Sequence, residues 1–415
     1  MRTEQVGLAA LVVCLGAVPS ARAQDNALRF SAGLSAGSES NVFRAPPGEE
    51  IRDHYAGASL SASVDETIGR QRLQSSLTLR HSDYSRRDDL DNTGYGLLAD
   101  WSGATAGELS WKLSYATNRS LASYASALEP ERRVANVETS RQFIAAAQLG
   151  RFAQWIVSTT YSHRSIDYSA RAYAQDQYRL DSLGLSGQWR PLGPLSVTLG
   201  PRLTQGRFPQ ARLNADGSAS EDRFERHDLD LSSTWAITGA STLSGRLSLT
   251  RQRYDLLSDR DFSGATGQLA WDWIATGKTR LSAQLSRDTG SETSFFTVAL
   301  LGQQVRGTGD NSQLTTRLLT RLDHDMTGKI SFNAAAQIAQ RSLAASSLLG
   351  NGGVVLNDEA GRERSASLSV GVRYAATRSV TLGCDVTHQR RTSDTVLSTT
   401  YRGESISCTG RVATR

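Results

Sequence analysis

Apolar and polar residues alternate along nearly the whole sequence, and this period of two constrains the fold more than any other feature. In the stretch STLSGRLSLTRQRYDL, residues 241–256, the apolar side chains of Leu243, Leu247 and Leu249 fall on one parity. Polar side chains fill the other. Such a segment forms a β-strand with one apolar and one polar face. The fold must cover many apolar faces, although the mean hydropathy of the chain is only −0.37.

The first 23 residues have the pattern of a secretory signal peptide. Arg2 supplies a positive start, VGLAALVVCLGAVP is a short apolar segment, and ARA offers small residues before Gln24. Cys14 lacks the small residues that precede a lipidated cysteine, so we do not expect a lipoprotein. The sequence predicts a signal peptide over 1–23 and one mature domain over 24–415.

The remaining sequence excludes several classes of protein. No later segment approaches the ~18 apolar residues of a membrane-spanning helix. The exported chain is therefore either soluble outside the cytoplasm or a membrane β-barrel. Its net charge is +5 and it has no long basic block, which argues against nucleic acid as a partner.

Alternating runs and turn signals divide the mature chain into about eighteen strands. The predicted strands are 27–39, 54–66, 70–83, 93–103, 108–120, 138–150, 154–165, 176–190, 194–206, 223–238, 241–255, 263–275, 278–290, 312–326, 329–342, 363–376, 379–391 and 399–412. Short turns such as TIGR and ATGK alternate with long loops such as NVFRAPPGEEIRD. Outer-membrane barrels sort their connections in this way, with short periplasmic turns and longer extracellular loops.

The tryptophans follow the same division. All of them fall near short turns and share a face with apolar residues, which predicts an aromatic girdle at one membrane interface. Packing in a protein core is the alternative. The girdle residues are Trp101, Trp111, Trp155, Trp189, Trp235, Trp271 and Trp273.

We therefore predict an all-β protein, a transmembrane antiparallel up-and-down β-barrel of about eighteen strands in the outer membrane. The apolar faces contact lipid, and closure of the sheet removes edges that lipid could not satisfy.

The polar faces would line a lumen, which in a barrel of this size is wide enough for an aqueous path unless it is plugged. Its basic candidates are Arg29, Arg80, Lys112, Arg202, Arg246, Arg280, Arg317, Arg321, Arg373 and Arg411. The acidic residues on this face are Asp100, Asp228, Asp230, Asp272, Asp323 and Asp385. Rings of Arg or Lys select anions in pores. The alternative is that these groups pair across strands and only solubilise the interior.

Two loops and two cysteines give further expectations. The apolar loops TSFFTVALLGQQ and SLLGNGGVVLN either narrow the mouth of the barrel or extend its hairpins. Cys384 and Cys408 lie equally far from Val396, at the tip of the last loop, and share the apolar parity. A cross-strand disulfide is therefore reasonable if the turn registers there.

We find no motif that predicts an enzyme. The histidines lie on different strands, and no GxSxG, HExxH or glycine-rich phosphate loop occurs. The sequence implies no metal and no cofactor.

The stretch LRHSDYSRRDDLDNTGYGLLADWSGATAGELSWKLSY, residues 79–115, has a Tyr, a loop with LDNxxY, and then a turn flanked by Trp. Together with the cysteine pair, it resembles the β-barrel porin 2 group, in particular the EpsL-type outer-membrane proteins of exopolysaccharide systems linked to exosortase and PEP-CTERM sorting. The resemblance implies a role in exporting a secreted polysaccharide and brings no catalytic residues.

The resemblance makes exopolysaccharide export the leading functional hypothesis. A general or anion-preferring uptake porin is the alternative, and a structural barrel with a blocked lumen is a third. The expected partners are outer-membrane lipid and lipopolysaccharide, the polysaccharide, and periplasmic or inner-membrane components of a secretion system.

Overall fold

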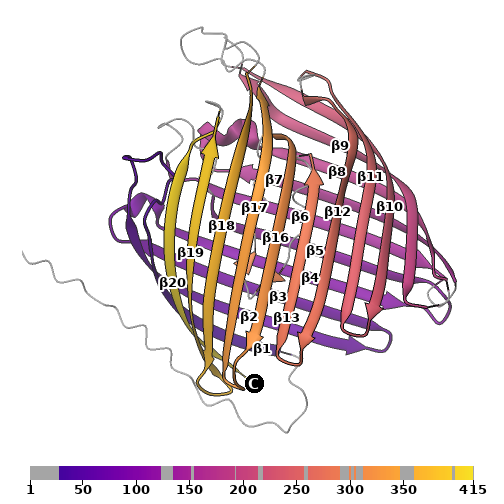
Figure 1. Ribbon diagram of the computed structural model, residues 1–415, viewed down its shortest axis with the longest axis horizontal. Helices are drawn as coiled ribbons and strands as arrows, with labels where there is room; N and C mark the ends of the chain where they lie inside the picture. The colour runs from indigo at the N-terminus through magenta and orange to yellow at the C-terminus, as the bar shows by residue number, and fades with distance from the viewer. Residues whose placement is uncertain are drawn as a thin grey trace, which may run out of the picture.

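The computed structural model describes residues 28–122, 134–150, 154–191, 193–213, 218–256, 260–289, 299–300, 303–304, 312–345, 359–394 and 398–414. Eighteen strands form one antiparallel sheet in which each strand pairs with its neighbours along the chain (Figure 1). The first strand also pairs with the last, with Gly33 opposite Arg411. The sheet is therefore a closed up-and-down barrel, and the predicted fold class is confirmed.

The strands of the barrel are β1 (Leu28–Glu39), β2 (Asp53–Ile68), β3 (Gln71–Tyr84), β4 (Asn92–Ala104), β5 (Ser110–Leu121), β6 (Val137–Leu149), β7 (Trp155–Tyr168), β8 (Tyr178–Trp189), β9 (Leu195–Leu213), β10 (Ala219–Thr238), β11 (Ser241–Tyr254), β12 (Phe262–Thr276), β13 (Thr279–Asp288), β16 (Ser312–Asp325), β17 (Ile330–Ala345), β18 (Glu359–Ala375), β19 (Val380–Ser393) and β20 (Tyr401–Ala413). Each falls on one of the predicted segments. Residues 1–23, the predicted signal peptide, lie outside the described residues.

The short connections are built from turn-forming residues. Three of them, between β2 and β3, β10 and β11, and β12 and β13, have two residues each and begin with Gly69, Gly239 and Gly277. Gly69 has a φ of 62°, a left-handed conformation that glycine adopts without steric cost. These tight turns fix the register of the hairpins they join.

The hairpin of β9 and β10 is longer than the sequence predicted. We expected a long loop over 208–222, but the ladder continues from Arg207 and Arg223 to Leu213 and Ala219. The ladder accommodates a register shift between Ser220 and Asp222. Backbone pairing thus replaces much of the predicted loop, because hydrogen bonding satisfies backbone groups that a loop would leave to water.

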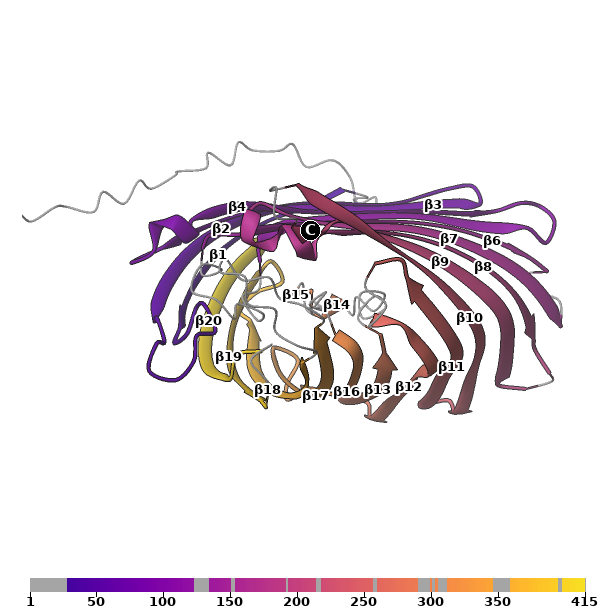
Figure 2. The same ribbon diagram turned by 90° about the horizontal axis from the view of Figure 1, so that it is seen from above.

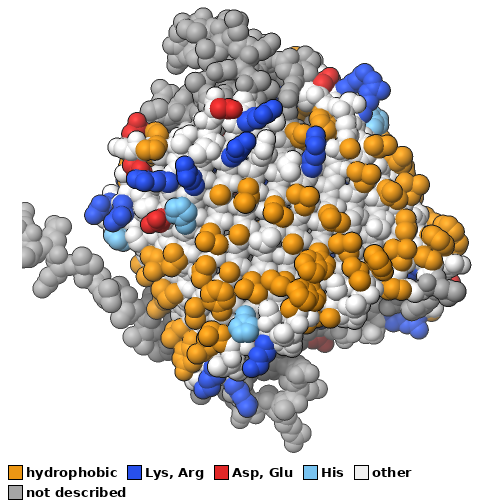
Figure 3. Space-filling view, viewed as in Figure 1, with side chains coloured by type: hydrophobic (Ala, Val, Ile, Leu, Met, Phe, Trp, Pro, Cys, Tyr) orange, Lys and Arg blue, Asp and Glu red, His pale blue; other side chains and the backbone are white. Residues whose placement is uncertain are grey.

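The outer face carries the apolar residues. Leu247 and Leu249 are 52% and 61% exposed, and Leu34 is 71% exposed. Figure 3 shows the outer face over β11–β13 and β16–β20, where hydrophobic side chains form a band with Lys and Arg gathered above and below it. Such a band contacts lipid in a transmembrane barrel, so lipid covers the apolar faces of the strands.

The barrel is flattened in cross-section. Seen from above, β2–β9 form a flat wall and β10–β13 with β16–β20 form a curved one (Figure 2). A separate two-stranded hairpin, β14 (Ala299–Leu300) with β15 (Gln303–Gln304), is seen within the ring of strands. The rest of the loop TSFFTVALLGQQ and the loop SLLGNGGVVLN lie outside the described residues.

A small apolar core lies at the long-loop end. Val42 and Phe43, from the loop between β1 and β2, pack with Leu90 and Tyr173. Leu90 ends the 3-10 helix η1 (Asp88–Leu90), and Tyr173 belongs to η3 (Arg171–Asp176). Among the described residues, no helix is long and apolar enough to cross a membrane.

Candidate functional site in the lumen

All ten basic candidates lie on the inward face of the sheet. Each has the parity opposite to the exposed apolar residues of its strand. Arg29, for example, lies between the outward side chains of Leu28 and Phe30, and Arg373 lies between Val372 and Tyr374. The alternation therefore sorts side chains between lipid and lumen as a barrel requires.

Some of these candidates are paired. Lys112 Nζ lies 3.4 Å from Asp100 Oδ1, and Arg321 Nε lies 3.0 Å from Asp323 Oδ2. In each pair one partner is largely buried, Asp100 at 23% exposed and Arg321 at 13%, while the other partner remains in contact with solvent. For these two cations the arrangement agrees with the interpretation that inward charges pair across and along strands.

Other candidates are not paired in this way. Arg29, Arg280 and Arg373 are exposed and form no ion pair within the described part of the chain. All three lie near the short-turn ends of their strands. Arg411, at the same end of β20, donates from Nη2 to Ser31 Oγ at 2.7 Å.

The curved wall carries a buried charge network at its long-loop half. The Arg226 guanidinium, 1% exposed, donates from Nε to Asp228 Oδ2 at 2.8 Å and from Nη1 to Thr289 Oγ1 at 2.6 Å. Thr250 Oγ1 donates to Asp228 Oδ1 at 2.5 Å and lies 3.0 Å from Thr266 Oγ1. Because these groups are excluded from water, their mutual hydrogen bonds replace hydration.

Arg202 joins the same network from β9. Its Nη2 lies 3.2 Å from Asp228 Oδ2, and its Nε lies 2.9 Å from Asp230 Oδ2. Asp230 also accepts a short hydrogen bond from Ser248. Arg202 is therefore a paired group of the wall. Arg246 lies on β11, two strands from Arg202, and is opposite Ser232 of β10 in the register.

A second buried network lies on β17–β19. Arg341 Nη2 lies 2.6 Å from Glu363 Oε1, and Arg391 Nε lies 3.3 Å from the same oxygen. Ser398 donates a short hydrogen bond to Glu363, and the Arg391 guanidinium lies 5.0 Å from the centroid of the Tyr401 ring. One carboxylate is thus shared by two arginines. Arg317 lies on the adjacent strand β16, opposite Ala339 of β17.

An apolar cluster covers the inward face above the first network. Tyr178, Leu180 and Phe224 are buried and pack with Phe208 and Tyr254. The rings of Phe224 and Tyr254 have centroids 5.0 Å apart. On this side of the barrel the inward side chains therefore pack against one another and are shielded from water.

Arg260 of the loop before β12 lies beside this cluster, its guanidinium 6.0 Å from the centroid of the Phe208 ring. Desolvation lowers the pKa of Arg260, and the nearby Asp222 carboxylate opposes this shift.

The outer face holds the remaining predicted residues. Trp155 and Trp189 stack with ring centroids 6.1 Å apart, and Trp101 and Trp111 meet edge-on at 4.7 Å. The seven tryptophans lie on β4, β5, β7, β8, β10 and β12 at the short-turn end. Aromatic residues at the edge of an apolar band are typical of an outer-membrane barrel. The chain is thus a porin-like barrel of the outer membrane.

Cys384 and Cys408 lie directly opposite each other on β19 and β20. They form a disulfide with a Cα–Cα distance of 4.1 Å. The bond is on the outward parity, with Leu382 and Val386, and joins the last two strands next to the closing contact with β1.

Sequence reasoning missed Arg226, Arg341, Glu363 and Arg391. The signal was present for Arg226, which shares the parity of Asp228 and could have been added to the inward residues. The position of a residue along its strand predicts the face of the sheet on which it lies, but not whether its side chain is buried, so burial could not be predicted for any of the four. Within the described residues, no group of three or more His, Cys, Asp or Glu side chains could hold a metal ion.

Comparisons with solved structures give matches of low sequence identity over most of the chain. The chain is 15% identical to OccK9 (OpdG) of Pseudomonas aeruginosa, with a TM-score of 0.48 over 93% of this chain and 98% of that one. OpdO of the same organism gives 13% identity and a TM-score of 0.48 over 93% and 97%. The siderophore receptor PirA of P. aeruginosa is 11% identical, with a TM-score of 0.44 over 94% of this chain and 80% of that one. No family model matches the chain, and neither does any curated protein.

Proposed function

We propose that the protein is a passive channel that admits small anionic solutes through the outer membrane. The observation that carries this proposal is the group of inward arginines at the short-turn mouth, Arg29, Arg373 and Arg411. They lie on β1, β18 and β20, which are joined in the sheet through β19 and the closing pair. None forms an ion pair with another described residue.

The register brings these arginines to one end of the wall. Arg411 lies opposite Gly33 on β1 and Thr381 on β19, and Arg373 lies opposite Gly383. The nearest acidic residue on the same inward face of β18–β20 is Asp385. The wall therefore has an excess of positive charge where it faces solvent.

The acidic groups beside Arg29 are already engaged. Asp65, the inward acid of β2, accepts from Arg72 Nε and Nη2 at 2.8 and 2.7 Å and from Gln74 Nε2 at 3.0 Å. Asp65 also interacts electrostatically with Arg29, but more weakly than with Arg72 and without forming an ion pair, so it offsets the charge of Arg29 only in part. A positive patch with hydrated surroundings concentrates anions near the mouth.

The mechanism is distributed weak contact. Arginine groups attract an anion, while inward Ser and Thr hydroxyls replace part of its hydration along the wall. Passage requires that no single contact be strong, since a tightly held solute would not leave. Arginines that are already neutralised, such as Arg202 and Arg226, hold the wall in shape instead of the solute.

The ion preference of single channels tests this proposal. We expect the wild-type barrel in planar bilayers to conduct with anion preference, measured from the reversal potential in a salt gradient. The variant R29Q/R373Q/R411Q should lose most of that preference. R402Q is the control for loss of a charge on the lipid-facing side, because Arg402 is an outward residue of β20, and R411Q is the inward single variant to compare with it. Cation preference of the wild type, or an unchanged triple variant, would contradict the proposal.

Exopolysaccharide export is the second candidate. It is supported by the resemblance of residues 79–115 to EpsL-type proteins and by the hydroxyl-rich inward face, for example Ser61 and Thr78. Deletion of the gene, followed by measurement of polymer outside the cell and in the periplasm, tests it. Polymer that is lost outside and accumulates inside would favour export over solute uptake. A folded barrel that conducts neither ions nor polymer would favour the structural barrel.

A further inference from the structure

The outer face of the barrel carries an unusual row of arginines at its long-loop edge. Arg179 on β8 lies opposite Arg207 on β9, and Arg207 lies opposite Arg223 on β10. We name Arg179, Arg207 and Arg223 the arginine row. All three are exposed and have the outward parity of Leu183, Leu203 and Leu229 in their strands.

Direct opposition of like charges destabilises a β-sheet, so the row needs a counter-charge. Arg223 Nε has one in Glu221 Oε1 at 2.6 Å. Arg179 and Arg207 form no ion pair among the described residues. The outward carboxylate of Asp181 is close enough to attract the charge of Arg207, but it also accepts from His163 Nδ1 at 2.8 Å and from Tyr161 Oη at 2.7 Å, so it offsets that charge only in part. An external anion would supply the rest of the counter-charge.

The row lies at the outer-leaflet boundary of the apolar band. Arg179 is ten residues along β8 from Trp189 of the girdle, or ~33 Å at about 3.3 Å per residue. A strand tilt of about 40° reduces this length to ~25 Å along the membrane normal, which is the usual height of the apolar band. The guanidinium groups thus lie at the level of the lipid headgroups.

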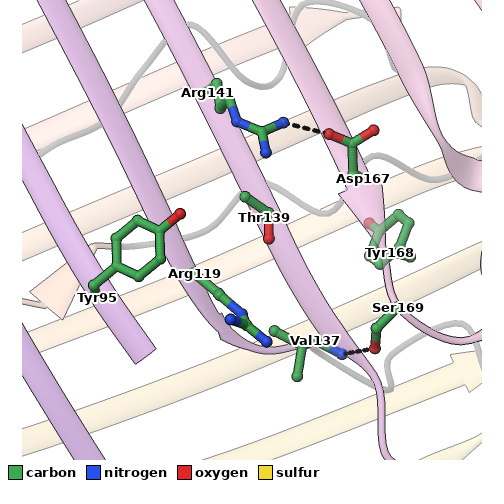
Figure 4. A pocket seen from close by; sticks show the side chains of 8 residues that line it. All are labelled: Tyr95, Arg119, Val137, Thr139, Arg141, Asp167, Tyr168 and Ser169. Atoms are coloured by element: carbon green, nitrogen blue, oxygen red, sulfur yellow. Dashed lines mark hydrogen bonds and ion pairs between the residues drawn. The ribbon is translucent and has the colours of Figure 1, made fainter. Parts of the chain in front are cut away.

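A pocket on the same face continues the row. It has a volume of about 260 Å³ and is lined by Tyr95, Arg119, Thr139, Arg141 and Asp167 among others (Figure 4). Tyr95, Arg119, Thr139 and Asp167 lie directly opposite one another on β4–β7.

The charges in this pocket are not balanced. Arg141 Nη1 lies 2.5 Å from Asp167 Oδ2, whereas Arg119 is exposed and has no ion pair within the described residues. Through Ser165, Arg141 is in register with Arg179. The pocket and the arginine row therefore form one continuous basic surface.

We propose that this surface binds the phosphate groups of a phosphorylated glycolipid headgroup in the outer leaflet. Arginine suits this ligand because its planar guanidinium makes paired hydrogen bonds to phosphate oxygens. The apolar band directly below accepts the acyl chains, and the pocket offers polar groups for the sugar. Free phosphate has the same charge but has neither acyl chains for the apolar band nor a sugar for the pocket, so the lipid is the occupant that fits the whole surface.

The test compares three-charge variants of the full-length barrel purified in detergent. R179Q/R207Q/R223Q removes the arginine row. K278Q/K329Q/R378Q removes the same charge from exposed short-turn residues at the opposite end and is the control. The probe is bis-phosphorylated lipid A, titrated while the number of bound lipids is read by native mass spectrometry. Heat-modifiable gel mobility checks that each variant is a folded barrel.

We expect the wild type and the control to bind the lipid equally, and the row variant to bind at least tenfold more weakly. R207Q alone should weaken binding, and R207K should weaken it less, because lysine keeps the charge but loses the paired hydrogen bonds. These single variants keep the test informative if the triple variant does not fold. Equal binding of fully dephosphorylated lipid A by the wild type would overturn the proposal. So would competition by inorganic phosphate at concentrations equal to the lipid, or an equal loss in the control.

Discussion

Two parts of the lumen wall are built from the same alternating pattern but differ in what their inward side chains do. On β2–β4 the inward residues are mostly small, such as Ser61, Ser76 and Thr78, and they remain half-exposed, while Arg80 is exposed. On β10–β12 the inward side chains of Arg226 and Thr266 are 1% exposed. The first part faces water and the second is packed.

The comparison shows that an inward arginine has no fixed role. Arg80 Nη2 lies 3.4 Å from Asn118 Oδ1 at a site reached by solvent. Arg226 is held by a carboxylate and two threonine hydroxyls in a site without water access. Solvent screens the first charge, whereas burial makes the second a structural component that cannot be left without its partner.

The largest effect should come from breaking the buried network. Asp228→Asn leaves Arg226 and Arg202 without their shared carboxylate, and we expect a loss of ~3–5 kcal/mol in the free energy of unfolding. Denaturant titration in lipid vesicles measures it. The double variant R226M/D228L removes both charges and should recover most of the loss. If Asp228→Asn costs no more than Arg80→Gln, the distinction between the two parts of the wall is wrong.

The next prediction concerns the disulfide between β19 and β20. It lies next to the pairing of β20 with β1, where the curved wall joins the flat one. Cys384 and Cys408 are separated by 24 residues in sequence, and a crosslink closing a loop of this length stabilises by ~3 kcal/mol in the chain-entropy model. We expect Cys384→Ala/Cys408→Ala to lose about this amount, and reductant to lower the stability of the wild type but not of the variant. A variant that unfolds at the wild-type denaturant concentration would contradict this expectation.

The tryptophans of the outer face allow a stacked pair on the flat wall to be compared with a tryptophan of the curved wall that has no stacked partner on the flat one. Trp155 and Trp189 stack, whereas Trp235 lies between Leu195 and Leu243 in the register. A double-mutant cycle with Trp155→Ala and Trp189→Ala should give a coupling energy of ~1 kcal/mol. The cycle with Trp155→Ala and Trp235→Ala should give none, since the two side chains lie on strands that do not pair.

The smallest effect is expected on the flat wall. Ser61 Oγ and Thr78 Oγ1 lie 3.0 Å apart in a half-exposed position. Thr78→Val should cost ~0.5–1 kcal/mol, because water can replace the lost hydrogen bond. The matched change on the curved wall, Thr250→Val, should cost more, since Thr250 bonds a buried carboxylate. Equal losses at the two threonines would show that the curved wall is more hydrated than its burial indicates.

The pattern of residues along the chain is enough to place the strands of the barrel, to count them at about eighteen, and to tell which side of the sheet each residue faces. The alternation in 241–256 assigns Leu247 to lipid and Arg246 to the lumen without any knowledge of neighbouring strands, because side-chain direction depends only on position along one strand. The tight turns at Gly69 and Gly239 also follow from local sequence.

Which inward groups meet, and which of them are buried, depends on the closed barrel as a whole. Arg226 reaches Thr289, 63 residues away, and Glu363 is shared by arginines from the two adjacent strands. Such contacts depend on register and on how the closed sheet curves, and both are set by pairing over the whole barrel. For the same reason, Arg179, Arg207 and Arg223 are three scattered cations in the sequence and become one row when β8, β9 and β10 align.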